Sequence, residues 1–137
     1  MIVVDTNILA YLYLPTVNTA QAESLLQNDP EWLAPLLWRS EFRNLLALYL
    51  RNKDMDFAQA CEIQAEAETL LAGNEYAVDS YSVLQLTLES RCSAYDCEYV
   101  GLAKKLGIPL VTNDRKVLKA FPDIAVSLKT VTCRDHH

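Results

Sequence analysis

A short apolar run that ends on a carboxylate occurs near each end of the chain, and it constrains the fold more than any other feature. In "IVVDTN" at residues 2–7 the carboxylate is Asp5, and in "IPLVTND" at residues 108–114 it is Asp114. Short runs rich in β-branched residues favour buried strands. Helical patterns separate the two runs, which predicts an α/β fold with a parallel sheet. Ligands of such sheets bind at the carboxyl ends of the strands, so both acids are expected to face one site.

The sequence pattern of the rest of the chain predicts mainly helices. Helical spacing, N-cap residues and turn signals predict helices over residues 7–14, 19–27, 36–51, 80–90 and 93–106, one from the "NKDMD" break to residue 71, and one after Asp114. Residues 32–34 and the "GNEYAVD" loop are expected to be extended or to hold short strands.

Size and charge limit the classes of protein to which the chain can belong. With 137 residues it is expected to form one domain over residues 1–137, with a flexible tail at the last few residues. The net charge of −6 argues against a protein that coats nucleic acid with basic surface. Acids gathered around a divalent cation can still attract phosphate, so phosphodiester chemistry is not excluded.

Several kinds of site are missing from the sequence. The cysteines form no C-x-x-C pair, and phosphate-loop, dinucleotide and H-E-x-x-H motifs are absent. His136 and His137 are the only histidines and lie at the very end, which argues against a Ser-His-Asp triad; whether they are native stays open. Asp5 interrupts the first apolar run too early for a signal peptide or a membrane span, so we expect a cytoplasmic protein without membrane contact.

Four acids remain as candidates for a site, and each has a plainer explanation to be weighed. Asp5 and Asp114 could simply be N-caps of the helices that follow them. Asp96 in "SAYD" fits a capping box that begins at Ser93.

Glu41 is harder to explain as a surface residue. It shares a helix face with Leu37, Leu45 and Leu48, which predicts that the face is buried. A buried carboxylate is costly unless a cation or a hydrogen-bond donor compensates it.

Taken together, these acids predict a metal site. Carboxylates brought close together repel one another unless a cation lies between them. Oxygen ligands favour Mg²⁺ or Mn²⁺, either of which can activate water for phosphodiester hydrolysis.

The sequence resembles the PIN-domain ribonucleases, and specifically the VapC-like toxins of type II toxin-antitoxin systems. The resemblance rests on "VVDTNIL" with Asp5, "RSEFRNLL" with Glu41, and "AYDCEYVGLAKKLGIPLVTNDRKVL" with Asp96 and Asp114. It covers nearly the whole chain, and the last of these stretches is the most specific.

The resemblance implies a three-layer α/β/α sandwich with a central parallel sheet and an Mg²⁺- or Mn²⁺-dependent endoribonuclease. It implies that Asp5 and Asp96 bind metal directly, that Asp114 does so directly or through water, and that Glu41 positions metal or water. It implies that four further residues contact and orient these ligands: Thr6, Asn7, Thr112 and Asn113. It further implies an RNA substrate, a homodimer and a small antitoxin partner that occupies the pocket or its entrance.

Two other interpretations of the function stay open, and a third is disfavoured. The scaffold could serve as a non-catalytic interaction module, although such a module has no need for a repulsive acid cluster. It could also be a solitary housekeeping PIN nuclease. A receiver-type signalling domain is expected to carry an acidic pair after its first strand, whereas Thr6 and Asn7 follow Asp5 here.

Overall fold

The fold is built on one sheet of five parallel strands. The computed structural model describes residues 1–134. Its strands are β1 (Ile2–Val4), β2 (Trp32–Pro35), β3 (Glu75–Tyr76), β4 (Leu110–Val111) and β5 (Ala125–Val126), in the order β3-β2-β1-β4-β5. All four neighbouring pairs are parallel. The chain moves outward from β1 through β2 to β3 and then returns to the other side of β1 with β4, so a topological switch point lies between β1 and β4.

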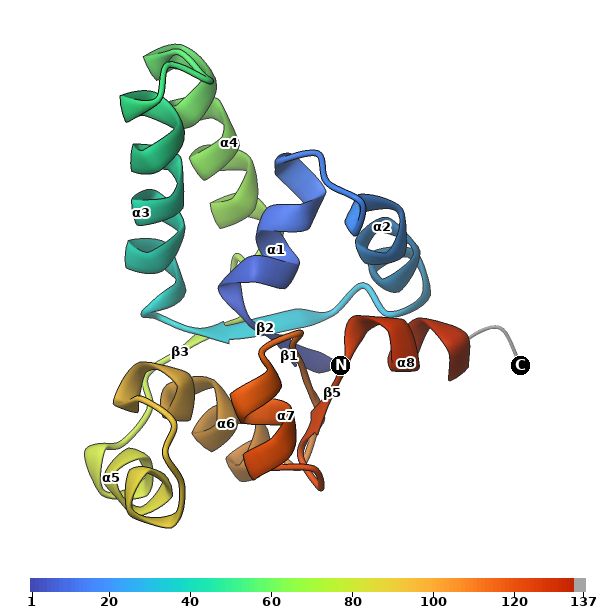
Figure 1. Ribbon diagram of the computed structural model, residues 1–137, viewed down its shortest axis with the longest axis vertical. Coiled ribbons are helices and arrows are strands. Elements are labelled where there is room, and N and C mark those ends of the chain that lie inside the picture. The colour runs from blue at the N-terminus through green and yellow to red at the C-terminus, as the bar shows by residue number, and fades with distance from the viewer. Residues whose placement is uncertain (135–137) are drawn as a thin grey trace.

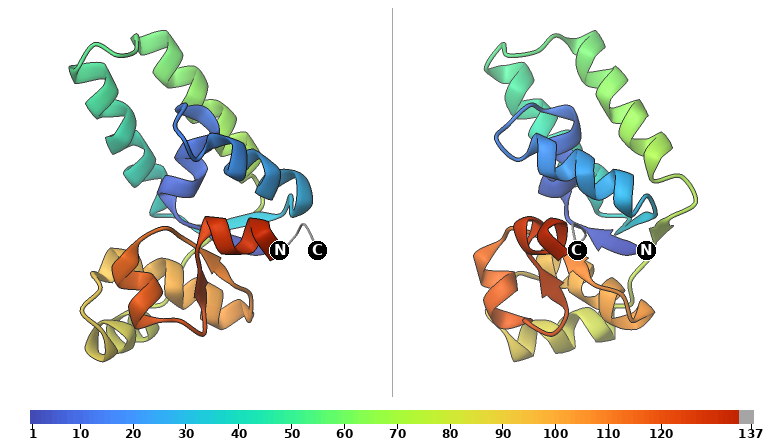
Figure 2. Two further views of the ribbon diagram at one scale, coloured as in Figure 1. Left: turned by 45° about the vertical axis from the view of Figure 1, so that its right-hand side comes forward. Right: turned by 90° about the vertical axis from the view of Figure 1, so that its right-hand side faces the viewer.

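Helices cover both faces of this sheet, which confirms the predicted α/β/α sandwich. The helices are α1 (Thr6–Tyr13), α2 (Thr19–Asn28), α3 (Trp38–Arg51), α4 (Phe57–Leu70), α5 (Ser80–Glu89), α6 (Ala94–Leu106), α7 (Arg115–Ala120) and α8 (Leu128–Arg134). Figure 1 shows α1 to α4 on one side of the sheet and α5 to α7 on the other. The α3–α4 hairpin projects away from the sheet in all three views (Figures 1 and 2).

The ends of the helices follow their local sequence. Asp56 caps α4 with a capping box completed by Gln59. Gly107 ends α6 with φ at +67°, a left-handed conformation that glycine adopts without steric cost. The strands β1, β2 and β4 are buried along their whole length, as expected for a sheet covered on both faces.

The predicted elements are confirmed except near the C-terminus. The strand predicted within 108–114 is only Leu110–Val111, because Asp114 is already the N-cap of α7. Backbone hydrogen bonds extend one residue beyond the strand at each end, from the Val3 N–H to the Pro109 carbonyl and from the Thr112 N–H to the Val126 carbonyl. Neither β5 nor α8 was predicted from the sequence. The two-residue β5 depends on pairing with β4, which residues 121–127 do not signal by themselves. The predicted tail, including His136 and His137, lies outside the described residues.

No helix within residues 1–134 has the length and apolarity needed to span a membrane.

Candidate functional site

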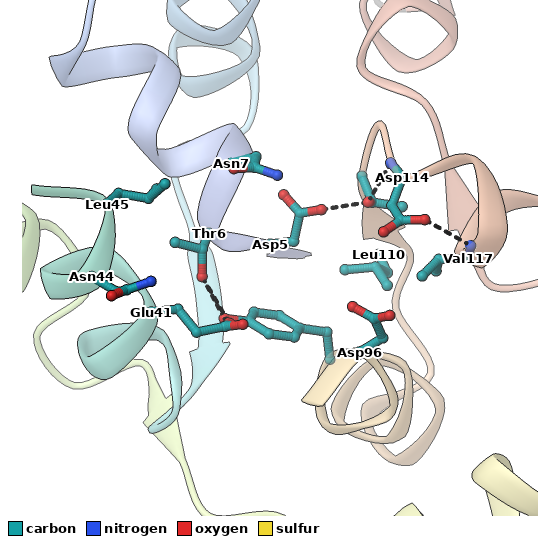
Figure 3. Close-up of a pocket in the computed structure, with 12 residues that line it drawn as sticks. Asp5, Thr6, Asn7, Glu41, Asn44, Leu45, Asp96, Leu110, Asp114 and Val117 are labelled. Carbon is teal, nitrogen blue, oxygen red and sulfur yellow. Dashed lines mark hydrogen bonds between the residues drawn. The ribbon is translucent and has the colours of Figure 1, made fainter. Parts of the chain in front are cut away.

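A pocket of about 220 Å³ lies at the switch point between β1 and β4, where the predicted acids meet. Figure 3 shows Asp5, Glu41, Asp96 and Asp114 around it. They come from four separate places in the fold: the end of β1, the first turn of α3, the first turn of α6, and the residue before α7. The pocket is also lined by Thr6, Asn7, Asn44, Leu45, Tyr99, Leu110, Thr112 and Val117.

Asp5 is both an N-cap and a pocket residue, so the two interpretations of its position are compatible. Its Oδ1 accepts a hydrogen bond from the backbone N–H of Ile8 at 3.0 Å, and its Oδ2 accepts one from the Thr112 hydroxyl. Burial raises the pKa of Asp5 from 3.8 to about 6, and the nearby charges of Asp114 and Glu41 act in the same direction. The two hydrogen bonds partly oppose this shift. Negative charge at Asp5 is therefore under-compensated.

Asp114 has a similar double position at the end of β4. Its Oδ1 accepts hydrogen bonds from the backbone N–H groups of Lys116 at 2.8 Å and Val117 at 3.3 Å, so it caps α7. Its own backbone N–H donates to the Thr112 hydroxyl at 3.0 Å. Because that hydroxyl donates to Asp5, Thr112 links the acids that follow β1 and β4.

Asp96 is the acid least engaged by the protein. The Ser93 hydroxyl accepts a hydrogen bond from the backbone N–H of Asp96 at 3.0 Å, so Ser93 caps α6 as predicted. Among the described residues, no group donates a hydrogen bond to the Asp96 carboxylate, so the reciprocal half of the predicted capping box is not formed. The carboxylate points into the pocket (Figure 3).

Two hydroxyl groups lie within hydrogen-bond distance of Glu41. Its Oε1 lies 2.6 Å from the Tyr99 hydroxyl and 3.1 Å from the Thr6 hydroxyl. The two hydroxyls are themselves 2.6 Å apart. Burial and the bond to Glu41 raise the pKa of Tyr99, so its phenol is protonated and is a hydrogen-bond donor at neutral pH.

The predicted burial of the Glu41 face was wrong in detail. The fully buried residues of α3 are Trp38, Phe42 and Leu46, one position further along the helix. Leu37 and Leu45 are only partly buried, and Leu48 is 47% exposed. The helix therefore turns its Trp and Phe side toward the core, and the face of Glu41 borders the pocket.

The predicted supporting residues separate into two groups. Thr6, Asn7 and Thr112 line the pocket. Asn113 does not line it, because its Oδ1 accepts a hydrogen bond from the backbone N–H of Leu128 at 3.1 Å and thereby holds the start of α8.

Two polar residues of the pocket, Asn44 and Tyr99, were not among the predicted site residues. Each follows a predicted acid by three positions on its helix, which places it on the same face as that acid. This spacing of three residues on a predicted helix was the sequence signal that could have identified Asn44 and Tyr99.

The chemistry of the pocket fits a hard divalent cation, although the structure does not gather a complete ligand set. Its charged groups are all carboxylates, and its other polar groups are hydroxyls and amides. Among residues 1–134, no three His, Cys, Asp or Glu side chains lie close enough to hold a metal. The under-compensated charge at Asp5 is the observation that favours a cation here.

Comparisons with known proteins agree with this architecture. The family model described as "PIN domain" matches residues 2–124. The chain is 30% identical over 134 residues to "Ribonuclease VapC3" of Pyrobaculum aerophilum, an alignment that covers 88% of this chain and 95% of the relative.

Solved structures show the same fold. "Crystal structure of PAE2754 from Pyrobaculum aerophilum" matches with a TM-score of 0.78 and 22% identity over 98% of this chain and 96% of that one. "Toxin-antitoxin complex from Klebsiella pneumoniae" matches with a TM-score of 0.67 and 17% identity over 93% of this chain and 98% of that one. At these identities the structural matches support the fold alone, and the family follows from the sequence matches. This chain belongs to the PIN domain family.

Proposed function

We propose that the chain is a metal-dependent endoribonuclease and the toxin of a toxin-antitoxin pair. The observation that carries this proposal is the convergence of Asp5, Glu41, Asp96 and Asp114 on one pocket from four separate elements. Local capping explains the positions of Asp5 and Asp114 one at a time, but it does not explain why all four acids line the same cavity.

The comparisons support the biological part of the proposal. The relative of 30% identity is named a ribonuclease, and one structural neighbour is described as a toxin-antitoxin complex. RNA is therefore the proposed substrate, and a small antitoxin that occupies the pocket or its entrance is the proposed partner.

Each acid has a distinct place in the proposed mechanism. Asp5 and Asp96 are the proposed direct ligands of Mg²⁺ or Mn²⁺, with Asp114 binding directly or through water and Glu41 positioning metal or water. When bound, such an ion supplies Lewis-acid stabilisation of the phosphodiester and lowers the pKa of water. Thr112 orients Asp5, and the backbone N–H groups at the start of α7 orient Asp114.

The proposal is tested most directly at Asp96, because no hydrogen bond from the described residues to its carboxylate is lost on substitution. We expect the wild type to cleave single-stranded RNA with Mg²⁺ or Mn²⁺ and to be inactive with EDTA. Asp96→Asn should reduce kcat by at least about 100-fold, because an ion of this kind supplies several kcal/mol of stabilisation. Cleavage is measured on a fluorescent RNA oligonucleotide.

Asp56→Asn is the matched control for this experiment. It makes the same substitution at an exposed helix cap on the α3–α4 hairpin, outside the pocket, and should retain full activity. A folded wild type that cleaves no RNA with any metal, or an Asp96→Asn variant as active as the control, would reject the nuclease proposal.

The antitoxin partner is tested in cells. Expression of the wild type in a bacterial host should stop growth, whereas Asp96→Asn should not. Where a small reading frame adjoins the gene, its co-expression should restore growth and yield a complex that co-purifies. Growth arrest by wild type and Asp96→Asn alike would show that the effect does not come from the pocket.

A non-catalytic interaction module is the second candidate function, and two observations favour it. Asp5 and Asp114 already act as helix caps, and no three acids of the described residues form a ready ligand set. This candidate predicts that Mn²⁺ binds no more tightly to the wild type than to Asp96→Asn, as measured by calorimetry. Cleavage without growth arrest would instead indicate a solitary housekeeping nuclease.

A further inference from the structure

Tyr99 makes a hydrogen bond to Glu41 in the pocket, and the proposed mechanism assigns no role to it. It lies on α6, three residues after Asp96, and its side chain reaches Glu41 on α3. The residue is 3% exposed, yet it lines the pocket through its hydroxyl end. A buried phenol needs a hydrogen-bond partner, and the partner here is one of the four acids.

The number of hydroxyl protons determines which group donates in each of these contacts. Three short contacts join Glu41 Oε1, the Tyr99 hydroxyl and the Thr6 hydroxyl, but the two hydroxyls have only two protons to donate. The two shortest distances, both 2.6 Å, form a chain in which Thr6 donates to Tyr99 and Tyr99 donates to Glu41. The 3.1 Å contact from Thr6 to Glu41 is the longest and is left without a proton.

This chain of donors occupies one side of the Glu41 carboxylate. Oε1 accepts the hydrogen bond from the Tyr99 phenol at 2.6 Å. No donor among residues 1–134 is hydrogen-bonded to Oε2. Oε2 therefore has no hydrogen-bond donor among the described residues and can accept a hydrogen bond from water or bind a cation in the pocket.

We propose that Tyr99 is a positioning residue that holds Oε1 of Glu41 and so directs Oε2 into the pocket. Thr6 supports it by donating to the phenol oxygen. This inference rests on the proposed nuclease function, because its effect on the reaction passes through Glu41. It adds to that function a residue from α6 that controls an acid on α3.

The hydrogen bond itself can be tested without activity. In protein with isotope-labelled tyrosine, the Tyr99 hydroxyl proton should give a slowly exchanging, downfield ¹H NMR signal. The signal should be absent in Tyr99→Phe and should move upfield in Glu41→Gln, because a neutral amide oxygen is a weaker acceptor. A signal that Glu41→Gln leaves in place would overturn the inference.

The effect on catalysis is tested by a double-mutant cycle. Tyr99→Phe should lower kcat by about 10- to 100-fold, as is typical when a partner behind a site residue is lost, and should change KM by less than about threefold. In the Glu41→Gln background the same substitution should have no further effect, because Tyr99 acts through Glu41. Additive losses in the two variants would overturn the inference.

Thr6 provides a second, milder test of the donor chain. Thr6→Val removes the hydroxyl that donates to Tyr99 but leaves the bond from Tyr99 to Glu41, so its loss of kcat should be smaller than that of Tyr99→Phe. Thr6→Ser keeps a hydroxyl and should retain most of the activity. If Thr6→Val loses more activity than Tyr99→Phe, the assigned order of donors is wrong.

Tyr49→Phe is the control, since Tyr49 is on α3 like Glu41 but lies outside the pocket, and it should leave kcat unchanged. Failure of the wild type to cleave RNA rejects the proposed function and, with it, the positioning role of Tyr99 in the reaction. An active wild type with unchanged kcat in a folded Tyr99→Phe variant rejects the role of Tyr99 alone.

Discussion

At the scale of single residues, burial in the pocket raises the pKa of Asp5. Its raised pKa of about 6 means that the folded protein binds the Asp5 proton more tightly than the unfolded chain does. The stabilisation is complete below pH 3.8 and is lost as the pH rises through about 6. At neutral pH the ionised Asp5 therefore costs the metal-free fold up to roughly 3 kcal/mol.

Asp5→Asn should remove this cost. The variant keeps an oxygen that can cap α1, so we expect its free energy of unfolding without metal to exceed that of the wild type at pH 7.5 and to match it near pH 4. Urea unfolding between these pH values measures the difference. A wild type whose stability relative to Asp5→Asn does not fall with pH would contradict the assigned shift.

Asp79→Asn is the matched substitution with the opposite sign. Hydrogen bonds from the backbone N–H and hydroxyl of Ser82 hold the pKa of Asp79 below its usual value. Its stabilisation is present throughout the range from pH 4 to 7.5 and is lost only at more acidic pH. Asp79→Asn should thus lower stability across this range instead of raising it.

At the scale of elements, an ion pair connects the start of α3 to β3. Arg39 Nε lies 2.6 Å from Glu75 Oε2, and Arg39 Nη2 lies 2.7 Å from Glu75 Oε1. The indole N–H of Trp38 donates to the same Glu75 Oε2 at 2.8 Å. These contacts hold the helix turn that carries Glu41 against the edge strand of the sheet.

Glu75→Ala should test this connection. It leaves the N–H of the fully buried Trp38 without an acceptor, which should lower the free energy of unfolding by about 1–3 kcal/mol. Glu75→Gln keeps an oxygen for Trp38 and should lose less. Denaturant unfolding compares the variants, and equal stability of Glu75→Ala and wild type would show that core packing alone places α3.

At the scale of the whole molecule, α5 presents an unpartnered apolar face. Tyr81, Leu84 and Leu88 are 79%, 62% and 81% exposed and lie on one side of the helix by their spacing of three and four. An exposed apolar stripe of this kind commonly marks an interaction surface. If the chain forms the homodimer that the family resemblance implies, this face is expected to be part of the contact.

Leu84→Glu combined with Leu88→Glu should convert such a dimer to a monomer, because each substitution would bury a charge in the contact. Light scattering during size-exclusion chromatography measures the mass. Phe57→Glu changes an equally exposed apolar residue on α4, on the other side of the sheet, and should leave the dimer intact. A monomeric wild type, or a dimer lost only in Phe57→Glu, would contradict the placement on α5.

How far the sequence predicts the protein depends on how local each signal is. The N-caps at Asp5, Ser93 and Asp114 depend on neighbouring residues, and all three were predicted from the sequence. The buried face of α3 was misplaced, since apolar residues occupy two adjacent faces of that helix. Only the core decides that Trp38, Phe42 and Leu46 turn inward.

The sequence alone predicts the α/β class, most of the helices and the four acids, because hydrophobic period, caps and strand-end residues act over a few positions. Which polar residues complete the pocket depends instead on tertiary packing. Tyr99 reaches Glu41 across 58 positions, and Asn113 binds the start of α8 instead of supporting the acids. Hydrogen bonds of this range depend on how elements dock on the sheet, and no local pattern encodes that geometry.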